Sequence, residues 1–157
     1  MNLNTYEKNL IKYIEDNNIQ ATHLIFNESC HSAHEAAKAA NVEVENIVKS
    51  ICFIDKNNDL IVAILSGDDK ISIPNVRHAL NIPRPRTATE EEILQKTGYV
   101  CGGVPSLGYE AKFLIDEKVM DKDNILMGGG SPRSLVEISP KELIRINNGI
   151  IAKITKE

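Results

Sequence analysis

A chain of 157 residues is long enough for one domain with a hydrophobic core, and its 42% apolar and 25% charged residues are typical of an ordinary soluble protein. Aromatic residues make up only 4% and tryptophan is absent, which argues against an aromatic platform for stacking single-stranded nucleic acid. The net charge of −4 argues against broad, non-specific binding to a phosphate backbone, and we expect no DNA partner.

Cysteine usage and hydropathy indicate the compartment. Cys30, Cys52 and Cys101 are an odd number without the spacing of zinc ligands, so we expect free thiols in a reducing cytoplasm. No apolar run approaches the length of a membrane span and the N-terminus begins polar, which predicts neither a signal peptide nor a membrane partner. Without repeats or low-complexity linkers, residues 1–157 are interpreted as a single domain, with residues 1–20 as its N-terminal helical segment.

The first third of the chain predicts two helices and a strand. Apolar residues at helical spacing behind Thr5 indicate a helix over residues 5–17, and residues 22–26 are typical of a short strand. Ser32 and Glu35 have the spacing of a capping box, which predicts the start of an alanine-rich helix ending at Ala40.

A β-hairpin is predicted next. Residues 47–54 are rich in branched side chains, residues 56–59 favour a turn, and residues 60–65 form a second apolar run. Lys49 stands out near the start of the first strand. It is consistent either with an outward-facing lysine on a sheet edge or with a cation that projects into a pocket to meet a phosphate or carboxylate, and periodicity does not choose between them.

The remaining elements are mostly short strands joined by tight turns. We expect helices over 75–80, from the Thr89 capping box to about Gly98, and from the Ser139 capping box to about Ile146, with an extended segment at 84–87 and strands at 111–116, 124–127, 134–138 and 150–154. The expected fold is α+β, with a mixed, largely antiparallel sheet or partly closed barrel and surrounding helices. The glycines at 128–130 precede a strand and lack a following Lys-Ser/Thr pair, so they do not form a P-loop.

Residues 99–108 form the most distinctive segment. Gly102, Gly103, Pro105 and Gly108 predict a rigid, kinked loop with exposed amides, which suits a small-molecule pocket or the stabilisation of an oxyanion. An ordinary tight turn between two strands explains the same spacing.

Three further clusters have two interpretations each. Cys30, His31 and His34 are candidate metal ligands, but the capping box favours a helix start. Cys101 lies at the glycine loop and is either a hydrolase nucleophile or a packed thiol, with no histidine placed near it by local spacing. Four basic residues are consistent either with a strip that binds tRNA or with an ordinary solvated face: Arg77, His78, Arg84 and Arg86.

Several segments follow one another in a recognisable order. They are Ser32-x-x-Glu35-Ala36-Ala37, Ile47-Val48-Lys49-Ser50, Gly67-Asp68, the loop from Gly98 to Gly108, Ile115-Asp116 and Gly128-Gly129-Gly130. This ordered set, with a lone lysine in the first long strand, resembles the YbaK/ProX family of free-standing aminoacyl-tRNA deacylases and the related editing insertion of bacterial prolyl-tRNA synthetase. The resemblance extends from about residue 20 to the C-terminus.

The resemblance implies hydrolysis of the ester that joins a wrong amino acid to the 3′ end of tRNA, acting in trans during translation, with no metal and no cofactor. It implies catalytic roles for Lys49, Gly102 and Gly103, and substrate-binding roles for Ser50, Val104, Pro105, Ser106, Gly108, Asp116, Gly129 and Gly130. Ser106 stands where the family's glycine-x-x-x-proline loop has its proline, which here comes one residue earlier. The implied partners are a mischarged tRNA 3′ end and, as an open question, an aminoacyl-tRNA synthetase. The alternative is a binding module that holds a nucleotide or tRNA end without turnover.

Overall fold

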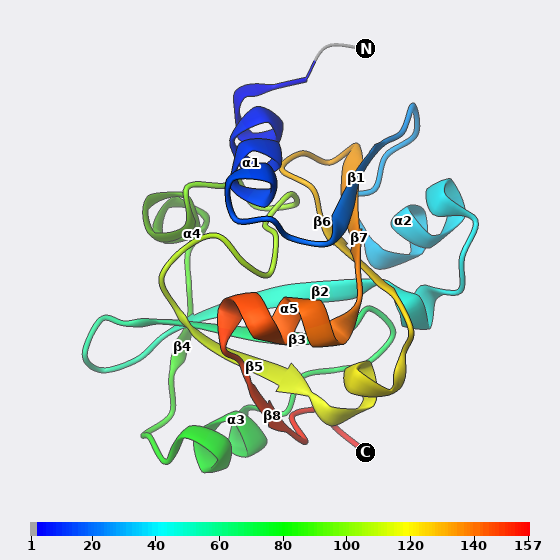
Figure 1. The fold of residues 1–157 in the computed structure, drawn as a ribbon. Helices are drawn as coiled ribbons and strands as arrows, with labels where there is room; N and C mark the ends of the chain where they lie inside the picture. Colours follow the sequence, from blue (N-terminus) through cyan, green and yellow to red (C-terminus); the bar gives the residue numbers. More distant parts are fainter. Residues whose placement is uncertain (1–2) are drawn as a thin grey trace.

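Two β-sheets organise the computed structural model, which describes residues 3–157 (Figure 1). The smaller sheet is antiparallel, in the order β1 (Ala21–Ile25), β7 (Ser134–Ile138) and β6 (Ile125–Gly128). The larger sheet has the order β4 (Arg86–Thr87), β2 (Val48–Ile54), β3 (Leu60–Ser66), β5 (Lys112–Asp116) and β8 (Ile150–Ala152).

The predicted hairpin of β2 and β3 is confirmed and forms the centre of the larger sheet. The two strands pair antiparallel from Val48 opposite Ser66 to Ile54 opposite Leu60. Every residue of β3 is buried, because its alternate side chains enter two different cores: Val62 and Ile64 face one, and Ile61 and Ala63 the other.

Five α-helices surround the sheets in residues 3–157, and their starts follow side-chain capping. They are α1 (Thr5–Asp16), α2 (Ala33–Ala40), α3 (Ile73–Leu80), α4 (Glu90–Thr97) and α5 (Pro140–Asn147), with short 3₁₀ helices η1 (Val44–Asn46) and η2 (Glu117–Asp121). The expected caps at Ser32, Thr89 and Ser139 are confirmed. Thr5, which the spacing made the candidate cap of the first helix, is instead its first residue, because the Asn4 side chain accepts the Glu7 amide while the Glu7 carboxylate accepts the Asn4 amide.

The helices cover the sheets in layers (Figure 1). Val76 of α3 packs on one face of the larger sheet, and Leu143 of α5 joins the core on the opposite face. The alanine face of α2 packs against Leu126 and Leu135 of the smaller sheet, where small side chains allow a close approach. None of the helices among the described residues is long and apolar enough to cross a membrane.

The predicted fold class is confirmed as mixed α+β, with neither sheet closed into a barrel. Four strand pairings are antiparallel, while β3–β5 and β5–β8 are parallel. Parallel pairing requires a long crossover, and the segment from α3 to the glycine loop supplies it between β3 and β5. The fold thereby brings that loop back toward the start of β2.

Candidate active site

A cavity of about 450 Å³ lies between the start of β2, the first turn of α2 and the glycine loop. It brings together Lys49 and Ser50 from β2 with Gly102 and Val104 from the loop, although some fifty residues separate the two pairs in the sequence. Of the two interpretations of Lys49, its position supports the cation that projects into a pocket. Its side chain is partly buried at the cavity instead of standing on an open sheet edge.

Backbone carbonyl groups hold the Lys49 ammonium. The Nζ atom donates to the carbonyl oxygen of Asp69 at 2.6 Å and to that of Gly67 at 3.3 Å. Burial lowers the pKa of Lys49 below its usual 10.5, and the nearby Asp69 and Asp68 carboxylates oppose that shift. Because carbonyl oxygens carry no formal charge, they orient the ammonium without neutralising it, and it can still attract an anionic ligand group.

The glycine loop forms the opposite wall. Gly102 has φ +93°, and a Cβ there would lie 2.6 Å from Nδ1 of His31, so the loop passes close to the α2 side of the cavity. The Gly103 N–H, predicted as an oxyanion donor, instead donates to the Val100 carbonyl at 3.0 Å and closes the turn. The oxyanion interpretation is therefore restricted to the Gly102 amide.

Ser50 is held from behind by Ser106. Their hydroxyl oxygens are 2.7 Å apart, and Ser106 is fully buried. The Asn147 side-chain amide donates to the Ser106 carbonyl at 2.9 Å, and the Ser106 N–H points to the Met127 sulfur at 3.5 Å. Ser106 thus supports the wall from outside the cavity, and Ser50 is the member of the pair that lines it.

The other predicted binding residues lie behind the loop instead of lining the cavity. The Pro105 carbonyl accepts the Tyr109 hydroxyl at 2.6 Å, and Gly108 faces the ring of Tyr13. The Gly129 carbonyl lies 2.8 Å from Nε2 of His23, and the Gly130 N–H donates to the Gly103 carbonyl at 2.8 Å. These contacts shape the wall, and direct substrate contact by these residues stays a prediction.

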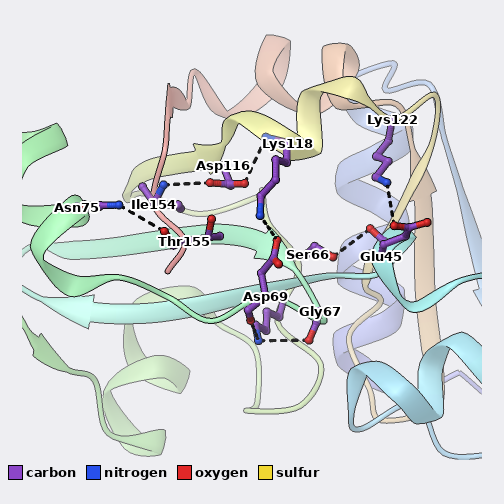
Figure 2. A network of polar contacts seen from close by, with 11 residues as sticks. Glu45, Ser66, Gly67, Asp69, Asn75, Asp116, Lys118, Lys122, Ile154 and Thr155 are labelled. Atoms are coloured by element: carbon purple, nitrogen blue, oxygen red, sulfur yellow. Dashed lines mark hydrogen bonds and ion pairs between the residues drawn. The ribbon is translucent and has the colours of Figure 1, made fainter. Parts of the chain in front are cut away.

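Asp116 is a structural carboxylate in this fold. It is fully buried, and its two oxygens accept the Ile154 N–H at 3.0 Å and the Lys118 N–H at 3.3 Å (Figure 2). It caps η2 and ties the C-terminal segment to the sheet, away from the cavity lining. These contacts give Asp116 a structural role, and the substrate-binding role that the resemblance implies for it stays a prediction.

Comparison with known proteins decides the family. A family model described as the aminoacyl-tRNA editing domain matches residues 27–146. The chain belongs to the aminoacyl-tRNA editing domain family. The predicted fold class and the predicted activity, the hydrolysis of aminoacyl-tRNA esters, agree with this assignment.

Relatives of the editing domain include free-standing and fused proteins. An uncharacterized protein of Bacillus subtilis, YwhH, is 28% identical over 120 residues, which cover 75% of this chain and 76% of YwhH. A proline–tRNA ligase of Pseudothermotoga lettingae is also 28% identical over 120 residues, or 75% of this chain, but the match spans only 21% of the ligase. A crystal structure described as a proposed trans-editing enzyme for prolyl tRNA synthetase superposes with a TM-score of 0.92 at 26% identity, covering 99% of this chain and 100% of that one.

The first turn of α2 lines the editing-domain cavity, which the sequence did not predict. Ser32, Ala33 and His34 line the cavity. The first N–H groups of a helix have no intrahelical partner and attract anions, so this turn adds to the positive character contributed by Lys49. Among residues 3–157, no group of three or more His, Cys, Asp or Glu side chains is arranged to hold a metal ion. The capping box at Ser32 predicted where the helix starts, but no pattern near it in the sequence showed that this turn lies beside Lys49.

All three cysteines line the editing-domain cavity. Burial raises the pKa of Cys30 to about 11 and that of Cys52 to about 12, so both thiols stay protonated and inert as nucleophiles. Cys101 is exposed, but within residues 3–157 no hydrogen bond joins its sulfur to a histidine. His31 lies beside the loop at Gly102 and lines the same cavity, but the hydrogen-bonded cysteine–histidine pair of a nucleophilic mechanism is not formed among the described residues.

Proposed function

We propose that this editing domain acts in trans on tRNA for proline that carries a wrong, small amino acid, and that residues 1–157 work as one domain with the 3′-terminal adenosine in the 450 Å³ cavity. The observation that carries the proposal is that Lys49 and Gly102 line the same cavity from opposite walls. The similarity to proline–tRNA ligases and to the structure described as a proposed trans-editing enzyme supports mischarged tRNA for proline as the substrate class. Such a protein works in the cytoplasm, where tRNA is charged.

The first step is binding of the terminal nucleotide, and the positive charge in the cavity determines its orientation. The Lys49 ammonium and the open N–H groups at the start of α2 form the positive side of the cavity, and the phosphate or ribose end of the terminal nucleotide binds there. This places the ester carbonyl toward the glycine loop, with the Gly102 N–H as the donor to the carbonyl oxygen. Ser50, oriented by Ser106, offers a hydroxyl to the aminoacyl group.

Hydrolysis then needs only water and positioning. The oxygen of a water molecule attacks the ester carbonyl carbon, the ester C–O bond breaks, and the proton of the water passes to the departing ribose oxygen. An aminoacyl ester is activated already, so positioning and oxyanion stabilisation carry the reaction without an enzymatic nucleophile. Apolar side chains such as Val104 and Ile93 line the cavity and favour a small, uncharged amino acid side chain.

A deacylation panel tests the proposal. Wild-type protein is incubated with tRNA for proline charged with alanine, cysteine, serine or proline, and release of the labelled amino acid is followed. We expect rapid release of a small wrong amino acid and retention of proline. Binding to every member with no release from any would replace this proposal with the binding-module alternative. A protein that acts only when a synthetase is added would establish that enzyme as the second partner.

A further inference from the structure

Two carboxylates flank the Lys49 ammonium, and neither pairs with it. Asp68 and Asp69 follow Gly67 in the turn after β3, and both charges act on Lys49. Within residues 3–157, however, no carboxylate oxygen lies within 4.0 Å of the Lys49 Nζ, which bonds only to the two carbonyl groups of the same turn. Something must keep these carboxylates away from the ammonium.

Lys118 holds the nearer carboxylate. Its Nζ lies 2.9 Å from Oδ2 of Asp69, and Figure 2 shows its side chain reaching down from η2 to the turn. The base of Lys118 is fixed, because its own N–H donates to buried Asp116. Asp68 is also engaged, 3.8 Å from Nε2 of His34 at the start of α2, but both of these side chains are largely exposed.

Geometry makes Asp69 the stronger competitor for Lys49. Its carbonyl oxygen already accepts the Lys49 ammonium at 2.6 Å, so rotation of its own side chain is enough to bring a carboxylate oxygen to the same nitrogen. The Asp69 side chain is only 28% exposed, and a partly buried pair there is weakly screened. A direct Lys49–Asp69 pair would cancel the charge that faces the cavity.

We propose that Lys118 is a positioning residue for deacylation: it holds the Asp69 carboxylate in an ion pair, so that the Lys49 ammonium stays available to the anionic part of the substrate. This inference rests on the role proposed for Lys49. Lys118 does not touch the substrate, since it does not line the cavity. Because it acts only through Asp69, the loss of activity on removing Lys118 should disappear when the Asp69 carboxylate is removed as well.

The test compares Lys118→Met, Asp69→Asn and the double variant by kcat/KM for deacylation and by the midpoint of thermal unfolding. We expect Lys118→Met to lose about tenfold in kcat/KM, mainly through KM, because the freed carboxylate captures Lys49. Asp69→Asn alone should stay near wild type, and adding it to Lys118→Met should restore activity. Lys118→Arg should keep activity by keeping the pair. If the Met variant does not fold, Lys118→Gln replaces it in the same cycle.

A purely structural ion pair gives a different pattern, in which both single variants and the double variant lose activity equally and in proportion to stability. That pattern, or wild-type kcat/KM in Lys118→Met, overturns the proposal. Lys122→Met is the matched control, since Lys122 follows the same 3₁₀ helix and pairs at 3.7 Å with Glu45 instead of Asp69 (Figure 2). Lys49→Ala separates the two proposals: full activity there refutes the role of Lys49 itself, whereas an inactive Lys49→Ala beside a fully active Lys118→Met refutes only the role of Lys118.

Discussion

The two walls of the cavity are built in opposite ways. On one wall, Lys49 and the turn at 66–70 are held by polar contacts between side chains and carbonyl groups, with Lys118 and His34 pairing the carboxylates. On the other wall, the loop at 100–104 packs backbone against backbone on the turn at 128–134. The first wall supplies charge and the second supplies shape.

This difference separates activity from stability. A charged side chain at a partly open site contributes little to folding, because its interactions with water are almost as good. Closely packed backbone tolerates no added atom, so a change there alters the fold and the cavity together. Substitutions on the lysine wall that remove the Lys49 ammonium or neutralise its charge should therefore reduce catalysis alone, whereas those on the loop wall should reduce both.

The largest effect is expected for Lys49→Ala. Loss of the only ammonium that our proposal places on the substrate should lower kcat/KM by about 10² to 10³, while the unfolding midpoint stays close to wild type. Lys70→Ala is the matched control, an exposed lysine of the same turn, and should keep full activity. A near wild-type deacylation rate in Lys49→Ala would remove the lysine wall from the mechanism.

Gly103→Ala should distort the loop wall and lower both the stability and the activity of the protein. A Cβ at this position would lie 2.6 Å from the Ser131 nitrogen and 2.7 Å from the Gly130 carbonyl carbon, and backbone atoms cannot move aside cheaply. We expect a loss of about 1–3 kcal/mol in urea unfolding together with reduced activity.

Gly98→Ala is its control. Gly98 has φ +82°, but no heavy atom lies within 4 Å of a Cβ there, so only the backbone strain of about 1–2 kcal/mol remains and activity should be kept. Equal activity losses in the two glycine variants would contradict the role assigned to close packing at Gly103.

Glu7 makes the loop wall sensitive to acid. Burial raises the pKa of Glu7, but hydrogen bonds from Asn4, Ser131 and Ser134 outweigh it and leave the pKa below 4.5. The ionised carboxylate thus contributes stability that is complete above 4.5 and is lost as the pH falls through the folded-state value. Glu7→Gln should cost about 1 kcal/mol at pH 7 and flatten the decline of the unfolding midpoint between pH 5 and 3, as measured by calorimetry. An unchanged acid profile would contradict this role.

The smallest effect is expected for Cys101→Ser. Since no hydrogen bond joins Cys101 to a histidine among the described residues, deacylation should stay within about twofold of wild type. Alkylation followed by mass spectrometry should label Cys101 first, because Cys30 and Cys52 are buried thiols with pKa values of about 11 and 12. A complete loss of activity in Cys101→Ser would restore the nucleophilic cysteine mechanism.

Local patterns predicted most elements because their causes are local. The Ser32, Thr89 and Ser139 caps lie three residues from the amides that they accept, and the hairpin turn lies between the strands that it joins. The parallel pairing of β3 with β5 was not predicted, since nothing within either strand specifies a partner some fifty residues away. For the same reason, the sequence did not show that Asp116 lies buried and accepts the N–H of Ile154, 38 residues further along the chain.

By itself, the sequence determined three of the helix caps, the central hairpin and the family, and it singled out one lysine and one glycine loop as candidates for the site. Only the tertiary structure decided that Lys49 and Gly102 share a cavity, that the Gly103 amide is already used, and that Lys118 occupies the carboxylate of Asp69. The physical reason is range. Capping and turn chemistry act over three or four residues, whereas Gly102 and Lys118 reach the surroundings of Lys49 only through the crossover from β3 to β5 and the 3₁₀ helix that follows β5.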